Sequence, residues 1–349
     1  MNHRNQSDSV KSDPVKAGPI KADPIKALGL CSGGLDSMVS ALLLKKQGIE
    51  VSFICFETPF FSSDSAKKAS LQTGIPLITK DITKEYMEMM KKPKAGFGKN
   101  MNPCMDCHAL MFSRAGELLK EQGCDFLFSG EVVGQRPKSQ NKNSLRYVEK
   151  NSGFDGYILR PLSAKIMPIT LTEQEGLVDR EQLMGISGRS RKIQMQMAEE
   201  FGIKDYPAPA GGCLLTDKIF SQRLKDLMYV QLAFETHEIH LLKYGRHFRL
   251  DSRTKLIVGR SKADNEGIIK YFNKKTDVLI KHTSLPGPVV ILTGQPSPEN
   301  IGLAAEICAA YTTHAPQDKS TSISVSERGT IRQIEVKKAQ AEDFRRFMV

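Results

Sequence analysis

Apolar residues along the first part of the chain occur in short runs that alternate with stretches of helical spacing. The short runs predict strands at 27–30, 50–56, 76–79 and 125–129. The stretches of helical spacing predict helices at 38–46, 65–73 and 105–122. Strands that alternate with helices favour the α/β class, with a parallel sheet that has helices on both faces.

The pattern changes further along the chain. Residues 130–151 are polar and basic, which predicts a long loop at the carboxyl edge of the sheet, and residues 158–205 return to helical spacing. From about residue 233 short strands alternate with turns, and a last helix is expected at 298–311. We therefore expect a disordered arm at 1–24, an α/β domain at 25–230, a smaller α+β domain at 233–315 and a polar extension at 316–349.

Composition and charge narrow the possible partners. The chain of 349 residues has a formal net charge of +11, which favours a polyanion such as nucleic acid. A polar N-terminus and the lack of a long apolar run predict a cytoplasmic protein without a membrane partner. An odd number of cysteines, seven, argues against a disulfide framework. Two of them form a Cys-x-x-Cys pair, which in a reducing compartment points to metal or sulfur chemistry.

The segment Ser32-Gly33-Gly34-Leu35-Asp36-Ser37 lies between an expected strand and an expected helix. Its two glycines let the backbone approach an anion, and the helix start offers free N–H groups and a positive dipole end. Asp36 suits this anion site if it helps to hold a divalent cation, Mg²⁺, that bridges phosphates. The segment lacks the lysine of a Walker A loop, so transfer of a γ-phosphate is not favoured.

This segment resembles the phosphate loop of the PP-loop ATP pyrophosphatases. Three further strings are similar to the catalytic domain of tRNA thiouridine synthases: Asn102-Pro103-Cys104-Met105-Asp106-Cys107, Gly130-Glu131-Val132-Val133-Gly134-Gln135 and Leu159-Arg160-Pro161-Leu162. The match is to the 4-thiouridine type, with Asn-Pro-Cys also similar to the 2-thiouridine enzymes. The resemblance, over roughly 25–215, implies that ATP is cleaved to AMP and pyrophosphate and that a uridine oxygen is replaced by sulfur. It implies an ATP site made of Ser32, Gly33, Gly34, Leu35, Asp36, Ser37, Phe56, Gly130 and Gln135.

Cys104 and Cys107 lie at the start of an expected helix, where the helix dipole is expected to lower the pKa of a thiol. Together with Cys213 they resemble the three cysteines that hold a [4Fe–4S] cluster in some PP-loop enzymes. Two alternatives stay open. Cys104 and Cys213 can carry and resolve a persulfide without metal, or the three cysteines with His108 can hold zinc. The catalytic residues are expected to be Asp36, Cys104 and Cys213, and the sulfur donor is expected to be a cysteine desulfurase or sulfide.

The C-terminal part contains Val258-Gly259-Arg260-Ser261-Lys262 and Lys281-His282-Thr283-Ser284. These strings are similar to the RNA-binding domain called NFACT-R, and the resemblance implies contact with structured RNA through Arg260, Lys262, Lys281 and His282. Arg136 and Lys138 in the polar loop, and Arg191 near a later helix start, extend this basic path.

Taken together, these features predict an ATP-dependent tRNA sulfurtransferase. Two other functions remain possible on the sequence alone: an RNA-binding adaptor whose ATP site is not catalytic, and a PP-loop enzyme that acts on a small molecule. The three cysteines and Asp36 argue against the first, and the basic charge argues against the second.

Overall fold

The computed structural model describes residues 24–136, 138–208, 213–231, 233–315 and 320–349. The arm expected at 1–24 lies, except for Pro24, outside the described residues. The chain forms two compact units. The first contains the described residues of 1–55, 63–80 and 108–208, and the second contains 56–62, 81–107 and the described residues after 208. The domain limits 25–230 and 233–315 stay a prediction.

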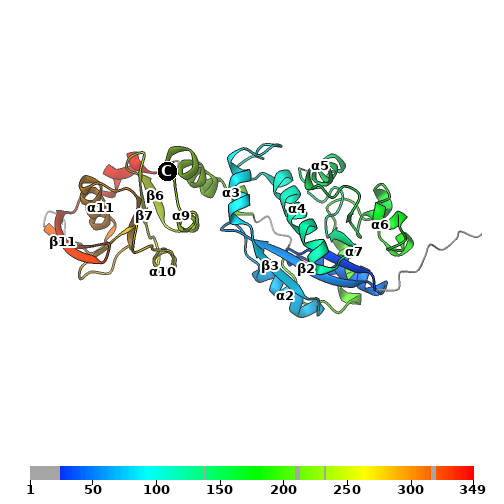
Figure 1. Ribbon diagram of the computed structural model, residues 1–349. Helices are drawn as coiled ribbons and strands as arrows, with labels where there is room; N and C mark the ends of the chain where they lie inside the picture. The colour runs from blue at the N-terminus through cyan, green and yellow to red at the C-terminus, as the bar shows by residue number, and fades with distance from the viewer. Residues whose placement is uncertain (1–23, 137, 209–212, 232, 316–319) are drawn as a thin grey trace, which may run out of the picture. The chain divides into compact units, whose positions relative to one another are not determined.

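The first unit contains a five-stranded parallel sheet, as the sequence predicts. Its strand order is β3-β2-β1-β4-β5, and β1 is paired in parallel with both β2 and β4 (Figure 1). The strands are β1 (Lys26–Leu30), β2 (Glu50–Glu57), β3 (Leu77–Asp81), β4 (Phe126–Ser129) and β5 (Ile158–Leu159). The order reverses between β1 and β4, and in such sheets ligands bind beyond the carboxyl ends of the strands at this reversal.

Helices cover both faces of this sheet, and Figure 1 shows α2 and α4 on opposite faces. The α-helices up to residue 200 are α1 (Leu35–Lys46), α2 (Asp64–Thr73), α3 (Thr83–Lys91), α4 (Cys104–Gln122), α5 (Lys142–Ser152), α6 (Leu171–Gln174) and α7 (Lys192–Glu200). Within the described chain, no helix combines the length and the apolar composition that a membrane span requires.

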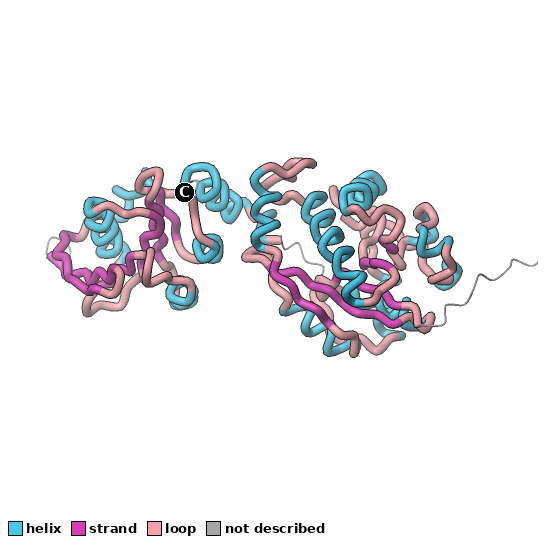
Figure 2. The backbone as a smooth tube through the Cα atoms, viewed as in Figure 1, coloured by secondary structure: helices cyan, strands magenta, loops and turns pink. Residues whose placement is uncertain are grey.

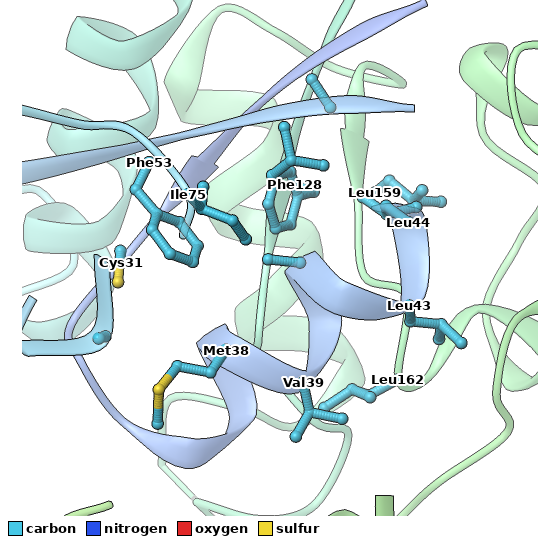
Figure 3. Packing of buried hydrophobic residues seen from close by; sticks show 14 of the residues in the cluster. Cys31, Met38, Val39, Leu43, Leu44, Phe53, Ile75, Phe128, Leu159 and Leu162 are labelled. Carbon is cyan, nitrogen blue, oxygen red and sulfur yellow. The ribbon is translucent and has the colours of Figure 1, made fainter. Parts of the chain in front are cut away.

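The core of the first unit explains why its strands read as apolar runs. Phe53 and Phe128 project from one face of the sheet into a cluster with Met38 of α1 (Figure 3). Ile54 and Leu127, which are adjacent to Phe53 and Phe128 in the same strands, point to the other face of the sheet and are also fully buried. Strands buried on both faces are typical of parallel sheets.

The sequence predicts a loop at 130–151, and this prediction is wrong for the second half of the segment, which forms α5. Asn141 caps this helix, because its side-chain oxygen accepts a hydrogen bond of 2.9 Å from the N–H of Ser144. Leu145 and Val148, three residues apart, are buried on one face, and Gly153 ends the helix with φ +81°. Two buried apolar residues in a polar segment are a weak sequence signal for a helix.

A buried ion pair connects the segments that follow β4 and β5. Nε of Arg160 donates to Glu131 Oε2 at 3.0 Å, and Nδ1 of His108 on α4 donates to Glu131 Oε1 at 2.7 Å. Arg160 also pairs with Glu149 of α5. Burial alone raises the pKa of Glu131, but the charge of Arg160 and the hydrogen bond to His108 outweigh burial and lower the pKa to about 2.

The second unit contains a six-stranded antiparallel sheet with the order β11-β10-β8-β9-β7-β6 (Figure 2). Its strands are β6 (Arg246–Arg249), β7 (Thr254–Val258), β8 (Val278–His282), β9 (Val290–Gly294), β10 (Ser320–Glu327) and β11 (Thr330–Lys337). The later helices are α8 (Lys218–Asp226), α9 (Thr236–Leu241), α10 (Lys262–Lys270) and α11 (Pro298–Tyr311). The sheet and its helices confirm the α+β class of the C-terminal part.

Residues 320–337, assigned from the sequence to a polar extension, form the last two strands of this sheet. In β10 the residues Thr321, Ile323 and Val325 are buried, and serines alternate with them. Ile323 and Val325 pack in one cluster with Phe248 of β6 and with α11. Alternation with period two is the pattern of a strand with one buried face.

The position of β10 in the core predicts the effect of truncating its side chains. Ile323→Ala should lower the free energy of unfolding of the second unit by about 2–5 kcal/mol, because it removes a fully buried side chain. Ile331→Ala on β11 should change it by no more than about 0.5 kcal/mol, because that side chain is 71% exposed. Urea denaturation of the full chain measures both values, and equal small effects would show that 320–337 is not part of the core.

The Glu131 ion pair predicts a dependence of stability on pH. The pKa of the Glu131 carboxyl is about 2 in the folded chain and about 4.5 in the unfolded chain. The unfolded chain therefore binds the proton more tightly. The stabilisation is therefore present above about pH 4.5 and is lost as the pH falls toward 2. Denaturation midpoints measured from pH 7 to acid should fall less steeply for Glu131→Gln than for wild type. Glu117→Gln, which changes a half-exposed acid, is the matched control and should follow wild type.

Candidate functional site

The phosphate loop follows β1 and leads directly into α1. Gly33 has φ +74°, and a Cβ at this position would lie 2.2 Å from the backbone carbon of Ser65. Only glycine fits this conformation and this contact. Gly34 then caps α1, and its carbonyl accepts a hydrogen bond of 2.7 Å from the Ser37 hydroxyl. The loop therefore presents the first N–H groups of α1 beyond the carboxyl end of β1, where an anion can bind.

The segment after β4 approaches this loop closely. A Cβ on Gly130 would lie 2.4 Å from the backbone carbon of Asp36 and 2.5 Å from the nitrogen of Ser37. Gln135 lies in the same segment, and its Nε2 donates to Asp36 Oδ2 at 3.0 Å. The structure thus brings together Asp36, Gly130 and Gln135, which the sequence assigns to one ATP site.

Asp36 is the charged group at the centre of this site. Burial raises the pKa of its carboxyl, whereas the hydrogen bond from Gln135 and the nearby Arg191, Gln194 and Arg136 lower it, and burial has the larger effect. Among the described residues, Oδ1 of Asp36 has no hydrogen-bond partner. A buried carboxylate oxygen without a protein partner is a suitable ligand for a hard divalent cation such as Mg²⁺.

The other residues assigned to ATP have different surroundings. Ser32 is exposed, whereas Leu35 and Ser37 are buried in the first turn of α1. Phe56 is buried near the end of β2, two residues beyond Ile54, which is paired with Leu30 of β1. Contact of these residues with ATP stays a prediction.

The three predicted cysteines lie near one another in the second unit. Negative charge on Cys104 or Cys213 would act on both Cys107 and Tyr86, which shows that the four side chains are neighbours. Cys104 is the first residue of α4, and its sulfur accepts a hydrogen bond of 3.3 Å from Asn102 Nδ2. Cys213 precedes the short 3₁₀-helix Leu214–Thr216. The sequence did not single out Tyr86, which reaches Cys107 from α3.

The structure contradicts the expected thiol activation at Cys107. Burial raises the pKa of this thiol to about 12, and nearby Cys213 and Cys104 raise it further, against a hydrogen bond from Tyr86. Desolvation therefore outweighs the helix dipole here, and Cys107 is held as a neutral thiol. In the described part of the chain no three cysteine, histidine or acidic side chains have the arrangement of a metal site. The described residues therefore show no group arranged to hold a [4Fe–4S] cluster or zinc. Nδ1 of His108 is bound to Glu131, which leaves Nε2 as its only ring nitrogen available to a metal.

The basic residues of the second unit lie at one edge of its sheet. Val258 of β7 pairs with Val290 of β9, and Val290 also pairs with Ile280 of β8. Because β7 and β8 are both antiparallel to β9, they run in the same direction and end at the same edge. Arg260 and Lys262 follow the end of β7, and Lys281 lies in the last two residues of β8.

The basic residues at this edge differ in how far their side chains are exposed to solvent and in whether they already have partners within the protein. Lys262 is 92% exposed at its side chain, and Arg260 is half exposed although it pairs with Asp264 at 2.9 Å. His282 has both ring nitrogens engaged: Nδ1 accepts from the N–H groups of Ser284 and Leu285, and Nε2 donates to Thr321 at 2.6 Å. Burial lowers the pKa of His282, so the ring is a neutral support for the turn after β8.

Arg136 and Lys138 are exposed on the segment after β4 in the first unit. Arg191, assigned from the sequence to the RNA path, lies close enough to Asp36 for its charge to act on that carboxylate, and its contact with RNA stays a prediction. Gln194 lies there too and was missed, because a glutamine in a helix gives no sequence signal of function.

Two separate parts of the chain match models of known protein families. Residues 24–166 match the family model described as thiamine biosynthesis protein (ThiI), and residues 245–348 match the model described as NFACT protein RNA binding domain. These matches confirm the two resemblances found in the sequence.

Curated relatives match the first part of the chain. The tRNA-specific 2-thiouridylase MnmA 2 of Thermoanaerobacter sp. (strain X514) is 31% identical over 160 residues, which cover 38% of this chain and 43% of that protein. The probable tRNA sulfurtransferase of Acholeplasma laidlawii is 34% identical over 141 residues, which cover 39% of this chain and 34% of that protein. The chain therefore spans less than half the length of these relatives.

Solved structures are less similar. A 4-thiouridine synthetase in complex with RNA and ATP is 20% identical, with a TM-score of 0.33 over 51% of each chain. The C-terminal part of a fibronectin/fibrinogen-binding protein from Streptococcus suis is 13% identical, with a TM-score of 0.26 over 76% of this chain and 94% of that one. At these TM-scores neither solved structure supports a conclusion about this chain. On the family models and the curated relatives, the chain joins a ThiI-type PP-loop domain, homologous to tRNA sulfurtransferases, to an NFACT-type RNA-binding domain.

Proposed function

We propose that the protein is an ATP-dependent tRNA sulfurtransferase that adenylates a uridine carbonyl oxygen and replaces it with sulfur. The observation that carries the proposal is the meeting of the phosphate loop, Asp36 and Gln135 at the point where the strand order reverses. The homology to tRNA sulfurtransferases and the group of three cysteines support the same function.

In the first step the loop of Ser32–Ser37 binds the phosphates of ATP through the N–H groups at the start of α1. Mg²⁺, when bound at Asp36, neutralises charge on the phosphates. The uridine carbonyl oxygen attacks the α-phosphorus, the bond to the β-phosphate oxygen breaks, and pyrophosphate leaves. Gln135 holds the Asp36 carboxylate in place through its hydrogen bond of 3.0 Å.

In the second step sulfur replaces the adenylated oxygen. This step uses the thiols alone. A persulfide on Cys104 attacks the activated carbon with its outer sulfur and expels AMP. The thiolate of Cys213 then attacks the inner sulfur, which releases the thiolated base and leaves a Cys104–Cys213 disulfide. With a cysteine desulfurase as the donor, a dithiol reductant first restores both thiols, and the Cys104 thiolate then takes the outer sulfur of the desulfurase persulfide. With sulfide as the donor, sulfide attacks Cys104 Sγ in the disulfide itself, which forms the Cys104 persulfide and releases the Cys213 thiolate. Cys107 has the least suitable thiol for attack, because its pKa is about 12.

In this proposal tRNA is held by the second unit. Arg260, Lys262 and Lys281 provide positive charge at one edge of its sheet, and such groups position RNA through its phosphates. His282, with both ring nitrogens bound within the protein, supports the shape of this edge and offers no donor to a phosphate.

The cysteine assignment predicts separate effects on the two steps. Cys104→Ser and Cys213→Ser should each lower thiolation of tRNA by at least about a hundredfold, since each removes a sulfur that forms a bond in the reaction. ATP binding should stay within about twofold of wild type. Thiolated nucleosides are measured by mass spectrometry of digested tRNA, and ATP binding by calorimetry.

Cys124→Ser is the matched control, because Cys124 is a partly exposed thiol outside the group. It should leave thiolation unchanged. Full thiolation by Cys104→Ser would contradict the assignment, and formation of ADP in place of AMP and pyrophosphate would overturn the proposed reaction. Metal analysis of anaerobically purified protein tests the cluster that the resemblance implies, since iron bound by wild type and lost from Cys104→Ser would assign these cysteines to it.

The basic edge predicts how tRNA binding depends on salt. The double variant Arg260→Gln, Lys262→Glu should bind tRNA more weakly and reduce the slope of log K against log salt by about 1 to 2. The control is the double variant Lys45→Gln, Lys46→Glu, which makes the same change of charge at two exposed lysines at the end of α1. Filter binding at several salt concentrations measures the slopes. An unchanged slope in the double variant would exclude this edge as the RNA contact.

A further inference from the structure

The first turn of α7 has a polar side chain on its buried face, where an ordinary surface helix has an apolar one. Gln194 is 0% exposed, whereas its neighbours Ile193 and Met195 are 46% and 50% exposed. Further along the helix, Met197 and Ala198 are buried in the core of the first unit, and α7 packs against α1. The first turn of α7 therefore directs a glutamine inward, toward the start of α1, and leaves two apolar side chains in solvent. This is the reverse of the pattern that stabilises a helix.

The inward side chains of this turn are not satisfied by the protein. Within the described ranges of the chain, neither Nε2 nor Oε1 of Gln194 makes a hydrogen bond of regular geometry, although its amide lies within reach of the Asp36 carboxylate. Nε of Arg191 and Oδ1 of Asp36 also have no hydrogen-bond partner there. Buried polar groups in native proteins are nearly always paired, and unpaired ones destabilise the fold. Several such atoms on three neighbouring side chains indicate a place where a ligand supplies the partners.

The position of these groups identifies the ligand chemistry. Arg191 and Gln194 lie close enough to Asp36 to act on the charge of its carboxylate. They therefore face the first turn of α1, where the phosphate loop presents its N–H groups. A guanidinium binds phosphate oxygens in pairs, and a carboxamide N–H donates to the same kind of oxygen. Asp36 beside them suits the cation that accompanies a pyrophosphate group.

We propose that Arg191 and Gln194 bind the pyrophosphate part of ATP and hold it as the leaving group of the adenylation step. Arg191 supplies positive charge to the β- and γ-phosphates, and Gln194 donates a hydrogen bond from its amide. Both are ligands that the phosphate loop alone does not provide, since Ser32–Ser37 contains no cationic side chain. This inference rests on the proposed ATP-pyrophosphatase function and names the residues that recognise its leaving group.

The proposal predicts a selective loss of affinity. In calorimetry with Mg²⁺ and separate titrations of ATP, inorganic pyrophosphate and AMP, Arg191→Gln should weaken binding of ATP and of pyrophosphate by about 10- to 100-fold. Binding of AMP should change by less than about twofold. Arg189→Gln is the matched control, because Arg189 is an exposed arginine two residues away, and it should bind all three ligands as wild type does.

Gln194→Leu separates a role in binding from a role in folding. Replacing a buried amide that makes no regular hydrogen bond with the described part of the protein by an apolar side chain of similar size should leave the thermal midpoint unchanged or raise it. The same variant should bind pyrophosphate more weakly than wild type. A lowered midpoint with unchanged pyrophosphate affinity would show that Gln194 is only structural.

The outcomes distinguish this inference from the proposed function. If wild type binds neither ATP nor pyrophosphate, the ATP-pyrophosphatase function itself is wrong. If wild type binds both and Arg191→Gln binds pyrophosphate equally well, only the assignment of Arg191 is wrong. An equal loss of ATP and AMP affinity in Arg191→Gln would place this residue at the adenylate end and would also overturn the proposal.

Discussion

The first turn of α1 and the segment after β4 approach so closely that a side chain at Gly130 would overlap the backbone of Asp36 and Ser37. This contact is possible only because β1 and β4 are neighbours and run parallel, so that both chains leave the sheet at the same edge. Once the two segments are in contact, the amide of Gln135 reaches the carboxylate of Asp36. The arrangement of the proposed ATP site thus follows from one steric constraint and the strand order.

The sheet edge itself is stabilised by the ion pair of Glu131 and Arg160. Each of these residues follows a strand, and the pair is buried, so removing either partner would leave an uncompensated charge in the core. Glu149 of α5 and His108 of α4 extend the pair to two helices that flank it. The strings Gly-Glu-x-x-Gly-Gln and Arg-Pro-Leu are therefore connected by this interaction, although about thirty residues separate them in the sequence.

Apolar periodicity was sufficient to predict β1, α1, β2, α2 and α11 to within a few residues, because each buries several side chains at regular spacing. It failed for α5 and for β10, where two or three buried residues stand among polar ones. The grouping of the cysteines was predicted, but the neutral state of Cys107 was not, since burial depends on residues such as Tyr86 that are distant in sequence. The position of Arg191 was missed for the same reason.

Two acidic residues at this edge show how similar surroundings produce different roles. Glu131 is fully paired, its pKa falls to about 2, and its charge stabilises the fold. Asp36 is only partly paired, burial raises the pKa of its carboxyl, and one of its oxygens has no partner among the described side chains. An incompletely paired buried carboxylate destabilises a fold, so its presence is understandable only if binding of a ligand compensates for it. The same reasoning applies to Gln194. The structural and the ligand-binding groups of this site can therefore be distinguished by how completely the protein satisfies each of them.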